Sequence, residues 1–339
     1  MTDPFQEALA EVEGFLLGEP PSLTRVEVCE RAGVPLEVAQ ELWRLLGFPH
    51  TDDDLVAFTP ADVEALRLSS DLMALGILSP ERQAALVRTW GRSFARLAEW
   101  QTTLLTDVAL ESGRDPAAQL TGLTEQVLPR VATLQDYVWR RHLASATSRV
   151  MGVASGAGSA VLAVGFVDIV GFTSRSRSLS EVELVAWVEQ FEAACTDVVT
   201  EHGGRVIKNI GDEVLFVSED VAAATRAALE MVRRGSDDDD AFPQVRAGVA
   251  YGEVVPRLGD VFGPTVNLAS RLTSLARPGS VLVERGARDA LGGIHPHDDE
   301  HEEDDHDHPD RETGEWRFRR LRRAAVKGYS RLEVWVVRT

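Results

Sequence analysis

The chain has 339 residues and a formal net charge of −19, and 44% of its residues are hydrophobic. This length predicts two domains, and the hydrophobic content is enough for a core in each. A net acidic chain disfavours binding to nucleic acid, which needs clustered Lys and Arg against the phosphates. Much of the acidity is local, because thirteen acids lie in two tracts, Asp237–Asp240 and His297–Asp310.

The sequence favours a cytoplasmic location. Its first residues are acidic and lack the basic segment of a secretory signal. No run approaches the roughly 20 apolar residues that span a bilayer, so we expect no membrane association. Cys29 and Cys195 lie in separate helical patterns, which argues against a disulfide and for a reducing compartment.

Residues 1 to about 150 are predicted to form an all-helical domain, followed by a linker of small residues to about residue 159. Thr59 before Pro60 is typical of a helix start. The last long helix of the domain is expected to be interrupted near Pro129. Apolar residues recur at helical spacing in five further segments: Gln6–Leu17, Ser22–Gly33, Pro35–Leu46, Pro80–Ser112 and Asp115–Met151.

From about residue 160 to residue 339, strand and helix patterns alternate. This alternation predicts an α+β domain in which helices cover one face of a sheet. Helices are expected at Ser180–Glu201, Asp220–Arg234, Asn267–Leu275 and Glu284–Leu291. Strands are expected at Val161–Val167, Arg205–Asn209, Glu213–Val217, Val245–Tyr251, Ser280–Val283, Trp316–Arg323 and Leu332–Val337.

Two aspartates occupy positions that a sheet can bring together. Asp168 ends a buried strand, and Asp212 lies in the tight turn of a predicted hairpin. Gly171 and Gly211 beside them allow close approach of the backbone. Paired carboxylates there suit a hard cation such as Mg²⁺, whereas either aspartate alone would more simply cap a turn.

Three motifs occur in order, namely Phe166–Thr173, Lys208–Glu213 and Asp260–Arg271. Together they resemble the catalytic domain of class III nucleotide cyclases over about residues 160–339. The resemblance implies a ferredoxin-like βαββαβ core and the conversion of ATP to cyclic AMP and pyrophosphate. It also implies that Asp168 and Asp212 bind two Mg²⁺ or Mn²⁺ ions, while the ribose 3′-hydroxyl attacks the α-phosphorus in line.

The same resemblance assigns the substrate contacts. Asn267 is expected near the ribose and Arg271 on the α-phosphate, four residues apart on one helix face. Lys208 and Asp260 take the places that recognise adenine, where an ammonium donates to N1 and a carboxylate accepts from the exocyclic amine. Guanine would present a carbonyl to Asp260, so ATP is favoured over GTP. Lys327 resembles a lysine that contacts the terminal phosphate.

Cyclases of this class divide each site between two subunits. One subunit supplies the metal-binding aspartates, and the other supplies the base-reading residues, the asparagine and the arginine. Since all six residues occur in this chain, the resemblance implies a symmetric homodimer with two equivalent sites. Two alternatives stay open, namely a guanylate or mixed-specificity cyclase, and a catalytically silent module that senses nucleotide.

The helical first half resembles the regulatory domain that precedes some actinobacterial cyclases. That resemblance implies a domain that restrains the catalytic dimer and releases it as pH falls. The segment also resembles a DNA-binding helix-turn-helix, with Pro35–Leu46 as the recognition helix. Glu37 and Glu41 outnumber Arg44 there, which is poor for phosphate contact and disfavours DNA.

The tract His295–Asp310 holds five of the eight histidines among nine acids. This composition is typical of a disordered acidic loop between a helix and a strand. Histidines among carboxylates also suggest a modest pH sensor. The sequence leaves the role of this tract open.

Overall fold

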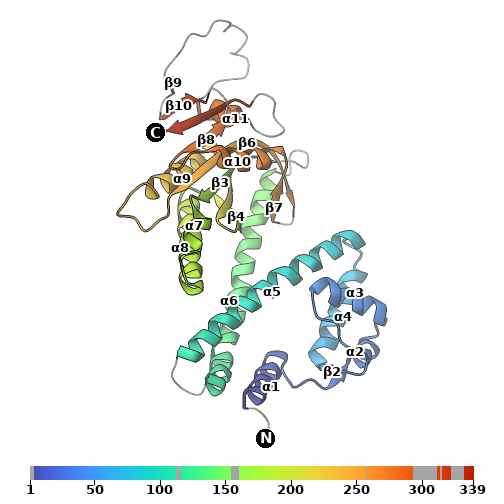
Figure 1. Cartoon of the computed structure of the whole chain (residues 1–339). Helices are drawn as coiled ribbons and strands as arrows, with labels where there is room; N and C mark the ends of the chain where they lie inside the picture. The colour runs from blue at the N-terminus through green and yellow to red at the C-terminus, as the bar shows by residue number, and fades with distance from the viewer. Residues whose placement is uncertain are drawn as a thin grey trace. The chain divides into compact units, whose positions relative to one another are not determined.

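The computed structural model describes residues 4–111, 116–153, 160–257, 259–292, 311–313, 315–321 and 332–339. The chain divides into two compact units, Met1–Met151 and Gly152–Thr339 (Figure 1). Most of the expected linker, residues 154–159, lies outside the described residues, as do Lys327 and the His-rich tract 295–310. Over the described residues, no helix combines the length and the apolar character needed to cross a membrane.

Helices dominate the N-terminal unit. They are α1 (Pro4–Leu17), α2 (Arg25–Ala32), α3 (Leu36–Leu46), α4 (Pro60–Ala74), α5 (Pro80–Glu111) and α6 (Pro116–Val153). Thr24 and Thr59 close capping boxes at the starts of α2 and α4, which satisfy backbone donors that the first turn leaves unpaired. A small core that includes Val28, Val63 and Leu66 holds α2, α3 and α4 together.

Two expectations for this unit were wrong. It contains a short antiparallel sheet of β1 (Leu23–Thr24) and β2 (Val56–Phe58), because the residues before the cap of α2 are extended and pair with a distant segment. Helix α6 runs through Pro129 without interruption. A proline removes one backbone donor, a local loss that a helix of 38 residues tolerates.

Over its described residues, the C-terminal unit is built on a nine-stranded sheet. Its strands are β3 (Ala160–Ile169), β4 (Arg205–Ile210), β5 (Glu213–Ser218), β6 (Val245–Arg257), β7 (Asp260–Phe262), β8 (Val281–Glu284), β9 (Arg311–Thr313), β10 (Trp316–Arg320) and β11 (Val334–Arg338). Its helices are α7 (Phe172–Ser176), α8 (Glu181–Glu201), α9 (Val221–Arg234), α10 (Pro264–Leu275) and α11 (Arg285–Gly292).

The strand order is β4-β5-β3-β6-β8-β11-β10-β9, with β7 paired to the far end of β6. Strands β6 and β8 run parallel, and the other pairs are antiparallel. The segment β3-α8-β4-β5-α9-β6 therefore has the expected βαββαβ order, and β3 lies at its centre.

Helices cover both faces of this sheet, so the expectation of one covered face was wrong. Ala163 and Val167 of β3 pack with α8, α9 and α11, whereas Val164 and Phe166 pack with α10 on the other face (Figure 1). The sequence contained a signal for this second covered face. Residues 162–167 of β3 form a continuous apolar run, and the structure buries every one of them. Such a continuous apolar run is typical of a strand buried on both faces.

Helix α10 approaches the sheet closely because β6 has a glycine beneath it. A Cβ on Gly248 would lie 2.5 Å from the backbone nitrogen of Thr273. The Thr273 hydroxyl donates to the carbonyl of Phe166 on β3 at 3.2 Å. These contacts fix the helix on which Asn267 and Arg271 lie.

We expect Gly248→Ala to lower the free energy of unfolding by about 1–3 kcal/mol, because the added methyl overlaps the backbone of α10. Urea denaturation measures this change. Gly122→Ala on α6 is the matched control, since its Cβ meets nothing within 4 Å. That change should stabilise the chain by about 0.5–1 kcal/mol. Equal stability of Gly248→Ala and the parent would contradict the close packing of α10.

Candidate functional site

Asp168 and Asp212 lie together at one edge of the sheet. Asp168 is near the end of β3, and Asp212 is in the turn between β4 and β5. The Ile169 amide donates to the carbonyl of Asp212 at 3.2 Å, which holds this turn against β3. Burial raises the pKa of the Asp168 carboxyl, and the neighbouring Asp212 adds to this effect. The expected convergence of the two aspartates is therefore present.

Two residues that the sequence analysis missed complete this edge. Arg246 on β6 and Glu213 on β5 flank Asp168 in the strand register, so the three side chains share a face. Arg246 donates to the Asp168 Oδ2 atom from Nε at 2.7 Å, and its Nη2 lies 2.5 Å away. Burial, Asp168 and Asp212 raise the pKa of Glu213 to about 7. For Arg246 and for Glu213, the signal available in the sequence was a single charged residue in an otherwise apolar predicted strand.

The paired carboxylates fit a divalent cation. Adjacent like charges at a partly buried edge are costly, and a bound cation would relieve that repulsion. In the described part of the chain, no group of three or more His, Cys, Asp or Glu side chains could hold a metal ion. A site with only two protein carboxylates suits Mg²⁺, which usually keeps its other positions for water and substrate phosphates.

Lys208 and Asp260 form a second pair. Lys208 lies on β4 and Asp260 begins β7, and their Nζ and Oδ2 atoms are 2.5 Å apart. The other Asp260 oxygen accepts from the Val261 amide at 2.8 Å, which fixes the carboxylate. The side chains of Lys208 and Asp260 are 42% and 27% exposed, so a ligand can reach both. The pair presents one donor and one acceptor side by side.

Asn267 and Arg271 share one face of α10. Asn267 is exposed and Arg271 is half-buried. The helix begins after Gly263, whose φ of 135° lies in the region that favours glycine. Among the described residues, no ion pair joins Asp168 or Asp212 to the Lys208–Asp260 pair. The structure therefore assembles the predicted residues into separate groups.

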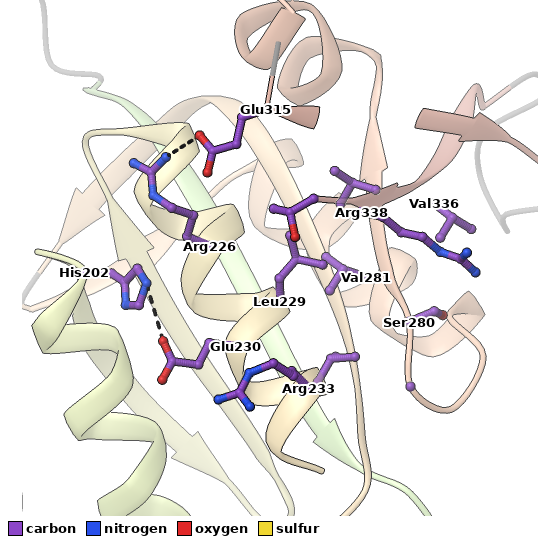
Figure 2. Close-up of a pocket in the computed structure, with 14 residues that line it drawn as sticks. His202, Arg226, Leu229, Glu230, Arg233, Ser280, Val281, Glu315, Val336 and Arg338 are labelled. Atoms are coloured by element: carbon purple, nitrogen blue, oxygen red, sulfur yellow. Dashed lines mark hydrogen bonds and ion pairs between the residues drawn. The ribbon is translucent and has the colours of Figure 1, made fainter. Parts of the chain in front are cut away.

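A hollow of about 690 Å³ lies between α9 and the ends of β8 and β11 (Figure 2). Arg226 pairs with Glu315 at 3.2 Å, and His202 faces Glu230 at 3.5 Å. Both glutamate side chains that line the hollow therefore already have partners. The residues that line it include none of the predicted site residues. This hollow is distinct from the candidate site.

Comparisons with known proteins agree with the motifs. Residues 158–337 match the model of the adenylate and guanylate cyclase catalytic domain, and residues 7–146 match that of the adenylate cyclase regulatory domain. The chain is 40% identical over 296 residues to an adenylate cyclase of Streptomyces coelicolor, covering 85% of this chain and 77% of the relative. It is 39% identical over 299 residues to an adenylate cyclase of Glutamicibacter nicotianae, covering 82% and 74%.

A more distant relative is a pH-sensitive adenylate cyclase of Mycobacterium tuberculosis. The two chains are 32% identical over 320 residues, which cover 90% of this chain and 76% of the relative. The expected family and fold class are thus confirmed: the chain belongs to the adenylate and guanylate cyclase catalytic-domain family.

Proposed function

We propose that the chain converts ATP to 3′,5′-cyclic AMP and pyrophosphate, under the control of its N-terminal unit. Its catalytic domain and its adenylate cyclase relatives identify an adenylate cyclase. The residue assignments rest on one observation. The catalytic unit holds both the Lys208–Asp260 pair and the adjacent carboxylates of Asp168 and Asp212. The first group offers recognition of a base, and the second offers a place for cations.

Asp168 and Asp212 would hold two divalent cations, either Mg²⁺ or Mn²⁺. When bound, such cations favour ionisation of the ribose 3′-hydroxyl and neutralise the triphosphate. Asn267 would orient the ribose. Arg271 would stabilise the charge that grows on the α-phosphate as pyrophosphate leaves, so catalysis is mainly positioning and electrostatics. Lys327, outside the described residues, is proposed to contact the terminal phosphate.

The base-reading pair favours adenine. The Lys208 ammonium can donate to adenine N1, and the Asp260 carboxylate can accept from the exocyclic amine. Guanine would turn its O6 toward Asp260 and its N1–H toward Lys208. An acceptor would then face an acceptor, and a donor would face a donor. Buried or partly buried polar groups that lose their partners discriminate strongly against the wrong ligand.

The proposed enzyme is a homodimer with sites that form between subunits. In each site Asp168 and Asp212 come from one subunit, while the partner contributes its base-reading pair and its α10. Two observations support this division: all six groups occur in one chain, and Lys208 pairs with Asp260 instead of with the metal-binding aspartates.

Regulation by the N-terminal unit, with pH as the signal, completes the proposal. It is supported by the regulatory-domain match over residues 7–146 and by the pH-sensitive relative. Helix α6 continues to Val153, only a few residues before β3 begins at Ala160. The helix that ends the regulatory unit thus directly precedes the first strand of the catalytic unit along the chain.

Binding of Mn²⁺ should raise the midpoint temperature of unfolding, because the cation binds the paired carboxylates only in the folded state. At a concentration 100 times the Kd, the stabilisation is about 2.7 kcal/mol. Asp212→Asn should remove most of the shift. Asp197→Asn, which changes an exposed acid on α8, should retain it. A full shift in the Asp212→Asn protein would contradict the cation site.

Division of the site between subunits is tested by mixing inactive variants. Asp168→Ala and Arg271→Ala should each abolish cyclic AMP formation. Their mixture should regain about a quarter of the parent activity, because half of the dimers are mixed and each holds one intact site. Asp168→Ala mixed with Asp212→Ala should stay inactive, since both changes affect the same half. Dimers that show no recovery in the first mixture would refute the division.

Base selectivity is tested by comparing kcat/KM for ATP and GTP. The parent should prefer ATP, and the double change Lys208→Gln with Asp260→Asn should reduce this preference at least about tenfold, because both selective hydrogen bonds are altered. Glu253→Gln, an exposed change on β6, is the control and should retain the preference. A parent that turns over GTP at least as well would instead be the guanylate or mixed-specificity cyclase.

A further inference from the structure

Arg246 connects two parts of the catalytic unit with different roles. One end of its guanidinium binds Asp168, with Nε at 2.7 Å and Nη2 at 2.5 Å from Oδ2. The other end, Nη1, donates to the carbonyl of Ser274 at 3.3 Å. Asp168 lies on β3, and Ser274 lies in the last turn of α10. A single planar guanidinium therefore joins the metal-binding edge to this helix.

The contact with α10 is favourable in its own right. Carbonyls in the last turn of a helix lack partners within the helix, and the helix dipole attracts a cation there. Ser274 follows Thr273, which is itself bonded to the β3 carbonyl of Phe166. The positive charge of Arg246 is thus shared between a carboxylate and the end of the helix that presents Asn267 and Arg271.

A cation bound by Asp168 would compete with Arg246. Both need the same carboxylate, whose side chain is only 15% exposed, and Arg246 is 35% exposed. Two cations against one partly buried carboxylate repel each other, which weakens the bond from Arg246. In the described part of the chain, Asp168 is the one ion-pair partner of Arg246. Cation binding would therefore leave the guanidinium with the end of α10.

We propose that Arg246 is a positioning residue that links cation binding at Asp168 to the placement of Asn267 and Arg271 on α10. The inference rests on the proposed division of sites between subunits. In that arrangement Asp168 and α10 of one subunit belong to different active sites. Arg246 therefore lets the state of one site influence the geometry of the other.

Arg246→Gln should raise the affinity for Mn²⁺ and lower the turnover number. The Kd for Mn²⁺ of the nucleotide-free protein, measured by electron paramagnetic resonance of free Mn²⁺, should fall about fivefold, the size of a partly exposed ion pair. The kcat should also fall, because the last turn of α10 loses one of its contacts with the sheet. General damage to the fold would instead weaken Mn²⁺ binding.

Two further variants refine this measurement. Arg246→Lys keeps a positive charge at Asp168 but cannot bridge to Ser274 at the same time, so Mn²⁺ affinity should match the parent while kcat stays low. Arg226→Gln on α9 breaks another arginine–carboxylate pair, that with Glu315, and should leave both quantities unchanged.

Mixed dimers separate the two roles of Arg246. The single intact site of an Asp168→Ala and Arg271→Ala dimer takes Asp168 from the second subunit and α10 from the first. Arg246→Gln in the Arg271→Ala subunit should lower the Mn²⁺ concentration for half-maximal activity about fivefold. Placed in the Asp168→Ala subunit, the same change should lower kcat and leave that concentration unchanged.

The outcomes are distinguishable. Mixed dimers that are inactive before any change at Arg246 would refute the divided site itself. Active mixed dimers in which Arg246→Gln has the same effect in either subunit, or no effect in both, would overturn the link. Unchanged or weaker Mn²⁺ binding by the nucleotide-free Arg246→Gln homodimer would overturn it as well.

Discussion

The catalytic unit depends on two negative charges held close together at the edge of a sheet. Antiparallel pairing of β3 with β5 places the β4–β5 turn beside Asp168, and the Ile169 amide fixes the carbonyl of Asp212 there. The cost is visible in the pKa values, since burial with nearby carboxylates raises that of Asp168 and brings that of Glu213 to about 7. Such repulsion favours any cation that reaches this edge.

An acidic chain that acts on an anionic nucleotide needs positive charge at a few chosen places. The net charge of −19 is misleading in this respect, because much of it belongs to tracts away from the motifs. In the first tract, Asp240 is bound by Arg234 of α9 at 2.9 Å, which lowers the pKa of its carboxyl. Near the site, Lys208, Arg246 and Arg271 provide positive charge on separate elements, and bound cations would add to it.

Residue spacing and capping predicted the long elements well. The helix expected at Ser180–Glu201 matches α8, which the structure starts with a capping box between Ser180 and Glu183. Short elements such as α7 and β7 escaped, since five or three residues are too few to show a period. The sequence motifs also predicted that Asp168 and Asp212 converge, because both lie within local strand and turn patterns.

Arg246 escaped for a different reason. It lies 78 residues after Asp168, and the two meet only because β6 and β3 pair in one particular register. A shift of one residue would turn Arg246 to the opposite face and leave Asp168 without its counter-charge. Motifs thus identify the two carboxylates proposed to bind a cation, whereas long-range register decides which charge that cation would displace. Under this proposal, the affinity for metal would be a property of the sheet as much as of the aspartates.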